Sequence, residues 1–331
     1  MYAVTLHGPR DVRLERVPAF QGDLKAGEAL VRTIVSGLSA GTEMAAVTAR
    51  YGTPFYGWPF HYPSVLGYLN VGRVAGVGPE TGDVAVGDVL YTFRQHRQEF
   101  VFPVSDPYWH VPDSVDPAVA VFTYLVSLAA HGLRRAGLVP GEHVAVVGLG
   151  AVGLGAVAMA RQYGSTVTAI DPIARRRDIA LALGADRVLD PRTDDMTAID
   201  ADVVLEAAGT WPAVETALDA VRYEGRIAVA ALHPTAGPES PLGETFYRKQ
   251  VALISTSFQS PEDFPKHAAR FTLRRGCQDV LDRMASGRMD FSPAVTHRIP
   301  FDRLPATYAA LEDGSLDAGA VAVEWEIRAP V

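Results

Sequence analysis

A glycine-rich segment in the middle of the chain has the residue types and the spacing needed to hold a phosphate group. Gly148, Gly150 and Gly153 form a GxGxxG pattern that follows an apolar, β-branched run and opens a helix-forming one. The first glycine allows a tight turn, the second lets the backbone approach a pyrophosphate, and the third lets the helix pack on the strand. Helical N–H groups would then point at the phosphates. We therefore predict a dinucleotide-binding site formed by Gly148, Leu149, Gly150, Ala151, Val152 and Gly153. The alternative is a glycine turn that binds no ligand.

An aspartate beyond this segment indicates which dinucleotide is bound. Asp171 follows the strand-like run Thr166–Ile170 and lies 18 residues after Gly153, near the spacing of a ribose-binding acid. Its carboxylate would accept hydrogen bonds from both ribose hydroxyls and repel a 2′-phosphate, so NAD(H) is favoured. NADP(H) stays possible because arginines pair with phosphate. Three arginines follow, Arg175, Arg176 and Arg177, and the last is better interpreted as a solvated residue in the first turn of a helix.

The composition excludes several other classes of protein. The chain has 331 residues, enough for about two domains. Asp plus Glu number 38 against 30 Lys plus Arg, a net charge of −8 without a basic run, which argues against nucleic-acid binding. Cys277 is the only cysteine, so an internal disulfide and a cysteine-built zinc site are excluded and a reducing, cytoplasmic location is expected. No signal peptide is recognisable, and the uncharged run 144–160 contains four glycines, which favours a buried strand and helix over a membrane span.

The predicted elements around these motifs fall into two patterns. The first third has short β-branched runs between glycines and prolines, typical of an all-β domain: 2–6, 12–17, 28–35, 71–75, 89–92 and 99–102. A helix is predicted from Pro117 to Leu133. Strands at 144–147, 166–170, 201–206, 226–230 and 251–255 then alternate with helices at 151–163, 176–183 and 213–221, which predicts an α/β fold with a doubly wound parallel sheet. The last part has a helix ending at Ser286-Gly287, a strand at 295–299 and a final strand at 320–327.

From residue 2 to about residue 325 the chain resembles the medium-chain dehydrogenase/reductase superfamily, the zinc-type alcohol dehydrogenase-like proteins. Besides the glycine motif, the matching segments are Gly87-Asp-Val89, Leu183-Gly-Ala-Asp186, Glu206-Ala-Ala-Gly209 and Gly225-Arg-Ile227. The resemblance implies a GroES-like β-barrel catalytic domain (1–117), a Rossmann NAD(P)-binding domain (118–265) and a C-terminal segment (266–331) that returns to the first domain. It also implies a substrate cleft between the domains, a homodimer, and cofactor contacts at Arg176, Ala208 and Leu232.

The chain departs from this family at the positions of its zinc ligands. Zinc-dependent members carry a cysteine, a Gly-His-Glu and a third ligand near the linking helix, where this chain has Ser39, Gly67-Tyr-Leu69 and Thr123-Tyr124. Neutral hydroxyls and an aliphatic chain do not suit zinc, and the family's four-cysteine lobe is missing too. The resemblance therefore implies a zinc-free member, and more narrowly a branch that includes bacteriochlorophyllide dehydrogenase-like proteins, which share a Gly-Thr-Glu and a Gly-Tyr motif.

Without zinc, a hydrogen-bond donor must polarise the substrate oxygen. Tyr68 replaces the zinc histidine and is the first candidate for that donor, with a pocket-filling role as the alternative. Either Thr42 or Ser39 could relay a proton, because the alignment is ambiguous by one residue there. Tyr124 would be a second donor or part of the pocket wall.

Two further side chains are candidates for proton chemistry. Glu43 could orient the substrate, act as a base or brace the turn that precedes it, and the bracing role is favoured. His96 could shuttle a proton or simply lie on the surface. Together with a tyrosine they offer too few strong ligands for a tight metal site. The aromatic segment 51–62 would either cover the substrate pocket or pack against the barrel.

Three functions follow from these features. The first is zinc-independent, NAD(H)-dependent interconversion of an alcohol and a ketone on a small polar substrate such as a polyol or cyclitol. The second is NAD(P)H-dependent reduction of an activated C=C bond, in which Tyr68 would polarise the carbonyl. The third is a nucleotide-binding protein that has lost catalysis together with the zinc ligands.

Overall fold

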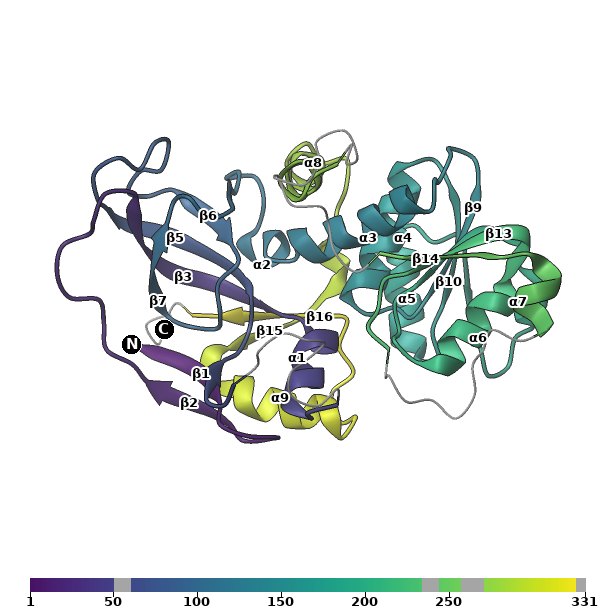
Figure 1. The fold of residues 1–331 in the computed structure, drawn as a ribbon, viewed down its shortest axis with the longest axis horizontal. Helices are drawn as coiled ribbons and strands as arrows, with labels where there is room; N and C mark the ends of the chain where they lie inside the picture. The colour runs from purple at the N-terminus through teal and green to yellow at the C-terminus, as the bar shows by residue number, and fades with distance from the viewer. Residues whose placement is uncertain (51–60, 234–243, 257–270, 326–331) are drawn as a thin grey trace. The chain divides into compact units, whose positions relative to one another are not determined.

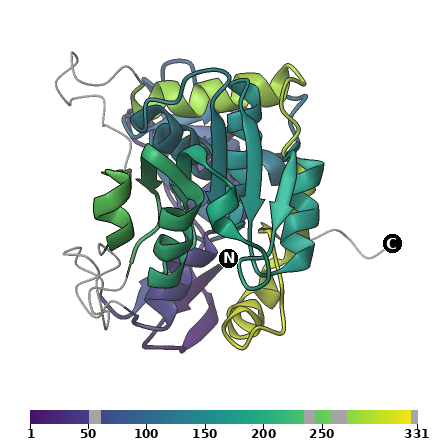
Figure 2. The same cartoon turned by 90° about the vertical axis from the view of Figure 1, so that its right-hand side faces the viewer.

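The computed structural model describes residues 1–50, 61–233, 244–256 and 271–325 and contains two compact units. One unit consists of Met1–Phe122 and Val295–Val331, and the other of Thr123–Ala294. In Figure 1 the first unit carries the purple, blue and yellow parts of the chain and the second the teal and green parts; Figure 2 gives a second view. Each unit is described by itself below. Most of the aromatic segment 51–62 lies outside the described residues.

The first unit is built on two sheets of mainly antiparallel strands. The smaller sheet has the order β2-β1-β4, and the larger one has the order β15-β16-β3-β5-β6-β8, with β7 also paired to β3. The last described strand, β16, pairs antiparallel with β3, so the C-terminal segment completes this sheet. The strands are β1 (Tyr2–Leu6), β2 (Val12–Arg16), β3 (Glu28–Leu38), β4 (Ser64–Val65), β5 (Leu69–Val77), β6 (Val89–Thr92), β7 (Glu99–Pro103), β8 (Tyr108–His110), β15 (Val295–Pro300) and β16 (Ala320–Glu324).

Helices of this unit depart from the sequence predictions at two points. Residues after Ser39, for which no helix was predicted from the sequence, form helix α1 (Ala40–Val47), whose alanines have high helix propensity. The single helix predicted from Pro117 to Leu133 is two helices, α2 (Pro117–Ala120) and α3 (Thr123–Arg135), and the boundary between the units falls between them. Asp116 caps α2 by accepting the N–H of Ala118. The remaining helix of this unit is α9 (Leu304–Glu312).

The second unit is a parallel six-stranded sheet in the order β11-β10-β9-β12-β13-β14. The strand order reverses between β9 and β12, and in sheets of this kind ligands bind at the carboxyl ends of the strands near that reversal. The strands are β9 (His143–Val147), β10 (Thr166–Ile170), β11 (Arg187–Leu189), β12 (Ala201–Glu206), β13 (Val221–Val229) and β14 (Ala252–Ser255). The predicted fold class, an α/β protein with a doubly wound parallel sheet and a separate antiparallel domain, is confirmed.

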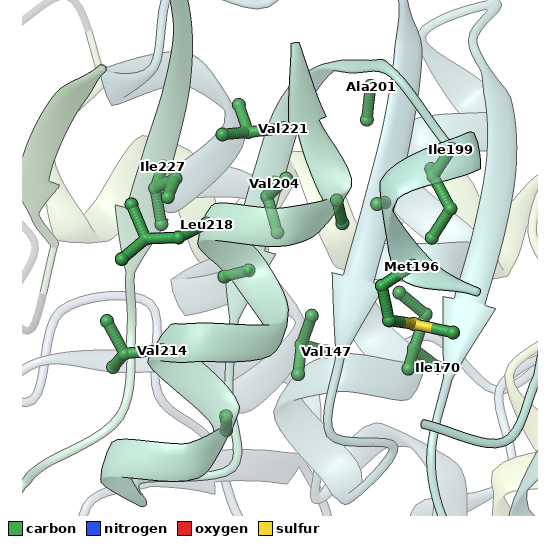
Figure 3. Close-up of a cluster of buried hydrophobic side chains, with 14 of the residues drawn as sticks. Val147, Ile170, Met196, Ile199, Ala201, Val204, Val214, Leu218, Val221 and Ile227 are labelled. Carbon is green, nitrogen blue, oxygen red and sulfur yellow. The ribbon is translucent and has the colours of Figure 1, made fainter. Parts of the chain in front are cut away.

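Apolar side chains between the sheet and its helices form the core of this unit. Val147, Val204 and Ile227 point from three neighbouring strands toward Val214 and Leu218 of helix α6 (Trp211–Ala220), as Figure 3 shows. Because helices cover both faces, the strands are apolar along their length rather than alternating. The other helices are α4 (Ala151–Gln162), α5 (Ala174–Ala182), α7 (Glu244–Lys249) and α8 (Leu273–Ala285).

Helix α8 lies in the second unit, although the sequence placed the return to the first domain at residue 266. Its Asp279 forms an ion pair with Arg134 of α3 at 2.6 Å, and Cys277 is buried beside Ser127 of the same helix. Burial raises the pKa of the Cys277 thiol to about 12, so it is a packing residue rather than a reactive one. Among the described residues, no helix is long and apolar enough to cross a membrane.

Candidate active site

The glycine motif lies at the carboxyl end of β9, where the chain turns into α4. Gly148 has φ +88°, and a Cβ there would lie 2.7 Å from the backbone nitrogen of Ala208. A Cβ on Gly153 would lie 1.8 Å from the carbonyl oxygen of Gly148. Both glycines are therefore required by the protein's own backbone, the first by its conformation and the second by packing.

Gly150 is different, because nothing in the protein requires a glycine at this position. Its φ of −77° suits any residue, and a Cβ built on it meets no atom within 4 Å. Gly150 also precedes α4, whose first-turn N–H groups have no helical partners. A glycine next to open space and to free N–H groups is what the close approach of a phosphate requires.

Asp171, the predicted ribose-binding residue, is buried directly after β10 and contacts the glycine loop. Its Oδ2 accepts the backbone N–H of Leu149 at 2.8 Å, and its Oδ1 accepts that of Ile173 at 2.9 Å. Arg176 approaches the same carboxylate at 3.8 Å. Asp171 thus fixes the glycine loop, and each of its oxygens retains a lone pair for a ribose hydroxyl.

Arg177 is not the solvated residue that the sequence suggested. It is half-buried, donates to the carbonyl oxygen of Asp171 at 2.7 Å and pairs with Asp190 at 3.2 Å. It therefore holds the end of β10 in place. The sequence could not show this because Asp190 belongs to the loop after β11.

The predicted contacts Ala208 and Leu232 lie in the loops that follow β12 and β13. Ala208 faces Gly148, and a Cβ on Gly209 would lie 2.6 Å from the carbonyl oxygen of Leu232. The glycine loop contacts the loop after β12, and that loop contacts the loop after β13, along one edge of the sheet. This is the edge at which doubly wound sheets bind dinucleotides.

In the first unit, Tyr68 and Ser39, which the resemblance predicted to stand at two zinc-ligand positions, bind each other. The Tyr68 hydroxyl donates to Oγ of Ser39 at 2.7 Å. Burial raises the pKa of Tyr68 to about 12, while hydrogen bonds with Ser39 and Thr42 partly oppose that shift. Tyr68 is thus a neutral phenol at physiological pH, and the structure brings it together with both predicted relay residues.

Glu43 lies in the first turn of α1 and is buried, and it accepts three hydrogen bonds. Its Oε1 accepts the backbone N–H of Ser39 at 2.7 Å, and its Oε2 contacts Nε2 of His96 at 2.9 Å. The hydroxyl of Tyr308, from α9, also donates to Oε2. Glu43 therefore braces the turn that carries Ser39, the role that the sequence favoured.

His96 is fully buried rather than on the surface. Its Nδ1 lies 2.7 Å from Oγ of Ser36, which also accepts the indole N–H of Trp325 at 2.7 Å. Ser36, His96 and Glu43 form a serine–imidazole–carboxylate chain like that of hydrolases. Ser36 has no exposed surface, however, so no substrate reaches it, and the chain is a structural brace.

This brace predicts a specific role for Gly67, the residue before Tyr68. Gly67 has φ +85°, and a Cβ there would lie 2.5 Å from Cδ2 of His96. We expect Gly67→Ala to destabilise the protein by about 3 kcal/mol, through backbone strain and overlap with the imidazole. Gly82→Ala is the matched control, because Gly82 has φ +63° and open space around it. Urea unfolding midpoints measure both, and equal losses for the two variants would contradict a role for the His96 contact.

Tyr124 lies in the first turn of α3 in the second unit, so it belongs to a different unit from Ser39, Thr42, Glu43, Tyr68 and His96. Three groups near the sites were missed by the sequence analysis: Tyr308 and Trp325 of the first unit, and the pair Glu206 and His233 of the second. Each makes its contact across a long stretch of chain, so no local pattern signals it. Of these residues, only Glu206 belongs to a segment that matches the family in sequence, Glu206–Gly209.

Side chains that could hold zinc are not assembled in the described residues. Neither within residues 1–50 and 61–233 nor within 244–256 and 271–325 do three His, Cys, Asp or Glu side chains form a group suited to a metal. Ser39 and Tyr68 offer neutral hydroxyls that already bond each other, and Glu43 and His96 are bonded to each other. These donors do not fit zinc, which prefers thiolate, imidazole and carboxylate ligands.

Comparison with known proteins agrees with the fold. Residues 151–274 match the family described as zinc-binding dehydrogenase. L-galactonate-5-dehydrogenase of Escherichia coli (strain K12) is 28% identical over 299 residues, 78% of this chain and 83% of that protein. Sorbitol dehydrogenase of Bacillus subtilis (strain 168) is 26% identical over 353 residues, 92% of this chain and 91% of that one. Among solved structures, an alcohol dehydrogenase from Thermus sp. ATN1 has a TM-score of 0.76 at 24% identity and covers 98% of this chain and 99% of its own.

Fold, glycine loop and relatives together define the class of protein. The chain is similar to zinc-type alcohol dehydrogenase-like proteins of the medium-chain dehydrogenase/reductase superfamily. Within it, the predicted enzyme class, an NAD(P)-dependent oxidoreductase, is confirmed.

Proposed function

We propose that this protein is a zinc-independent, NAD(H)-dependent oxidoreductase that interconverts an alcohol and a ketone on a polyol or sugar-acid substrate. The observation that carries the proposal is the hydrogen bond between Tyr68 and Ser39 at the positions of two family zinc ligands. In this arrangement the phenol of Tyr68, which can donate a proton, would take the place of the metal. The resemblance to the bacteriochlorophyllide dehydrogenase-like branch, a homodimer and a cytoplasmic location remain part of the same proposal.

The name of the matching family does not oppose zinc independence. The match covers residues 151–274, which lie in the second unit, whereas Ser39 and Tyr68 lie in the first. The donor chemistry of Ser39, Thr42 and Tyr68 supports hydrogen bonding and not metal ligation. We therefore derive no step of the reaction through a metal.

The dinucleotide would be held by the glycine loop and by Asp171. First-turn N–H groups of α4 would bind the pyrophosphate at Gly150, and Asp171 would accept the ribose hydroxyls. The position of Asp171 favours NAD(H), while Arg176 beside it leaves NADP(H) as the alternative. When bound, the reduced nicotinamide supplies the hydride that adds to the carbonyl carbon.

Tyr68 would supply the proton. Its hydroxyl would turn from Ser39 toward the carbonyl oxygen and give up its proton as that oxygen becomes an alcohol. The hydroxyls of Ser39 and Thr42 then stabilise the phenolate that remains until a proton from solvent restores it. In alcohol oxidation the same groups work in reverse, with the phenolate of Tyr68 as the base.

The raised pKa of Tyr68 predicts opposite pH dependences for the two directions. Reduction needs the protonated phenol, which predominates below pH 12 or so, and should therefore be nearly constant from about pH 7 to about pH 9. Oxidation needs the phenolate, whose fraction rises about tenfold per pH unit in that range. Initial rates in both directions, at saturating cofactor, measure this. A bell-shaped profile centred near neutrality would show that another group carries the proton.

The substrate class comes from the relatives, which include dehydrogenases named for L-galactonate, sorbitol and D-guloside. The test is a panel of polyols and sugar acids with NAD⁺, run beside a panel of enones with NADH and NADPH. Turnover only with enones would favour the C=C reductase, and tight binding without turnover would favour a non-catalytic protein. Elemental analysis of the purified protein tests zinc independence, because stoichiometric zinc that survives dialysis would overturn it.

A further inference from the structure

Two arginines face each other across the larger sheet of the first unit. Arg32 of β3 and Arg73 of β5 are partners in the antiparallel register, and both side chains are exposed. The two strands lie side by side in Figure 1. Residues directly opposite each other in such a ladder have Cβ atoms about 4.5–5.5 Å apart, and like charges at this spacing destabilise the pair. The protein alone therefore gains nothing from placing two guanidinium groups here.

A single carboxylate offsets part of this positive charge. Nε of Arg32 lies 3.2 Å from Oε2 of Glu99, whose Oε1 accepts the backbone N–H of Phe20. Arg73 donates to the carbonyl oxygen of Gly87 at 3.0 Å, and within the described ranges no carboxylate pairs with it. Two guanidinium groups and one carboxylate leave a net positive charge at this place, although the chain as a whole has a net charge of −8.

The same two arginines line a hollow of about 610 Å³. Gln98 contributes to its wall, and Ala75 and Trp325 add apolar residues. Sites that hold small molecules commonly have volumes of about 300–1,000 Å³. The hollow therefore has room for a molecule with an organic body and not only for a bare ion. Its described lining residues all belong to the first unit.

This hollow is not the place of the hydride transfer proposed above. Tyr68 directly precedes β5, and Arg73 lies five residues further along the chain, about 17 Å away at about 3.4 Å per residue. The glycine loop and Asp171 belong to the second unit. A ligand held by Arg32 and Arg73 would thus be bound by residues other than those proposed for the carbonyl substrate and the dinucleotide.

We propose that Arg32 and Arg73 form a second ligand site, which binds the oxyanion group of a small polar metabolite, a carboxylate or a phosphate ester. Guanidinium groups bind both kinds of oxyanion through paired, charge-assisted hydrogen bonds. An oxyanion between the two side chains replaces their mutual repulsion by two attractions. The amide of Gln98 would then hydrogen-bond the polar body of the ligand.

Calorimetric titration of the full chain tests this with three probes, D-gluconate, D-glucose 6-phosphate and neutral D-glucose. At least one of the two anions should bind at least about tenfold more tightly than glucose, because only the anions make charged hydrogen bonds. Arg73→Met should weaken that binding by a similar factor and leave the fold intact, since the side chain is exposed. Binding of gluconate identifies the ligand as a carboxylate, and binding of glucose 6-phosphate identifies it as a phosphate ester.

Two further variants make the test specific to this hollow. Glu99→Gln should strengthen anion binding about two- to threefold, because it removes a neighbouring negative charge and keeps an acceptor for the N–H of Phe20. Arg13→Met is the matched control: it removes the same charge from the same unit, but Arg13 pairs with Asp11 and does not line the hollow. It should leave anion affinity unchanged.

Each outcome decides the proposal. It is wrong if the wild type binds neither anion more tightly than glucose, or if Arg73→Met retains full anion affinity. Equal losses in Arg73→Met and Arg13→Met would show attraction to the overall charge instead of a site. If Arg73→Met does not fold, unchanged or weaker binding by Glu99→Gln overturns the proposal. The titration uses neither dinucleotide nor turnover, so a negative result leaves the proposed function standing.

Discussion

Replacing Gly150 by alanine is expected to weaken NAD(H) binding at least about a hundredfold while leaving stability unchanged. The added methyl group fits the protein, because no atom lies within 4 Å of it and the backbone conformation is ordinary. It would occupy the space that a pyrophosphate needs beside the first turn of α4. Losing two hydrogen bonds to a charged group costs about 3–6 kcal/mol, which is consistent with that loss of affinity.

Gly153 of the same motif provides the contrast. Gly153→Ala would drive a Cβ into the carbonyl oxygen of Gly148, so it should lower the unfolding midpoint as well as binding. Calorimetric titration with NADH and urea unfolding, run on both variants, separate the two effects. Full NADH affinity in a folded Gly150→Ala variant would mean that the pyrophosphate does not lie on this loop.

Much of the fold could be predicted because its strands are short, apolar and bounded by glycine or proline. Strands 2–6, 89–92, 166–170 and 201–206 match the structure at both ends, whereas β13 begins at Val221 instead of residue 226 and β11 (Arg187–Leu189) was not predicted. Helix α1 was not predicted, because it is only eight residues long and contains a glycine. The break between α2 and α3 was missed because an uninterrupted apolar run gives no boundary signal.

The candidate site was predictable only where its chemistry is local in sequence. The glycine loop and Asp171 follow strand ends at a characteristic spacing, and the structure connects them by a direct hydrogen bond. The brace around Glu43 was not predictable, because Tyr308 is 265 residues away in the chain. Similarly, the pair of Glu206 and His233 depends on β12 and β13 lying side by side, which is a property of the sheet.

Replacing Tyr68 by phenylalanine is expected to lower the rate of ketone reduction by about 10²–10⁴-fold, the usual contribution of a general acid. Tyr68 is half-buried and phenylalanine has the shape of its ring, so the fold and NADH affinity should be unchanged. The rise of alcohol oxidation with pH should also disappear, because the phenolate that causes it is gone. Single-turnover rates of NADH oxidation, with the substrate found by the panel, measure both effects.

Tyr308→Phe is the matched control, since it also removes one phenol hydroxyl from the same unit. Tyr308 donates to Glu43 and is fully buried, so its loss leaves a buried carboxylate with one donor fewer. We expect lower stability and a modest loss of turnover, with the pH profile of oxidation retained. If Tyr308→Phe abolished that profile and Tyr68→Phe did not, the proton would pass through Glu43 and His96. Full activity of Tyr68→Phe would instead reduce Tyr68 to a wall of the pocket, because a residue that gives the proton cannot be replaced by one that has none.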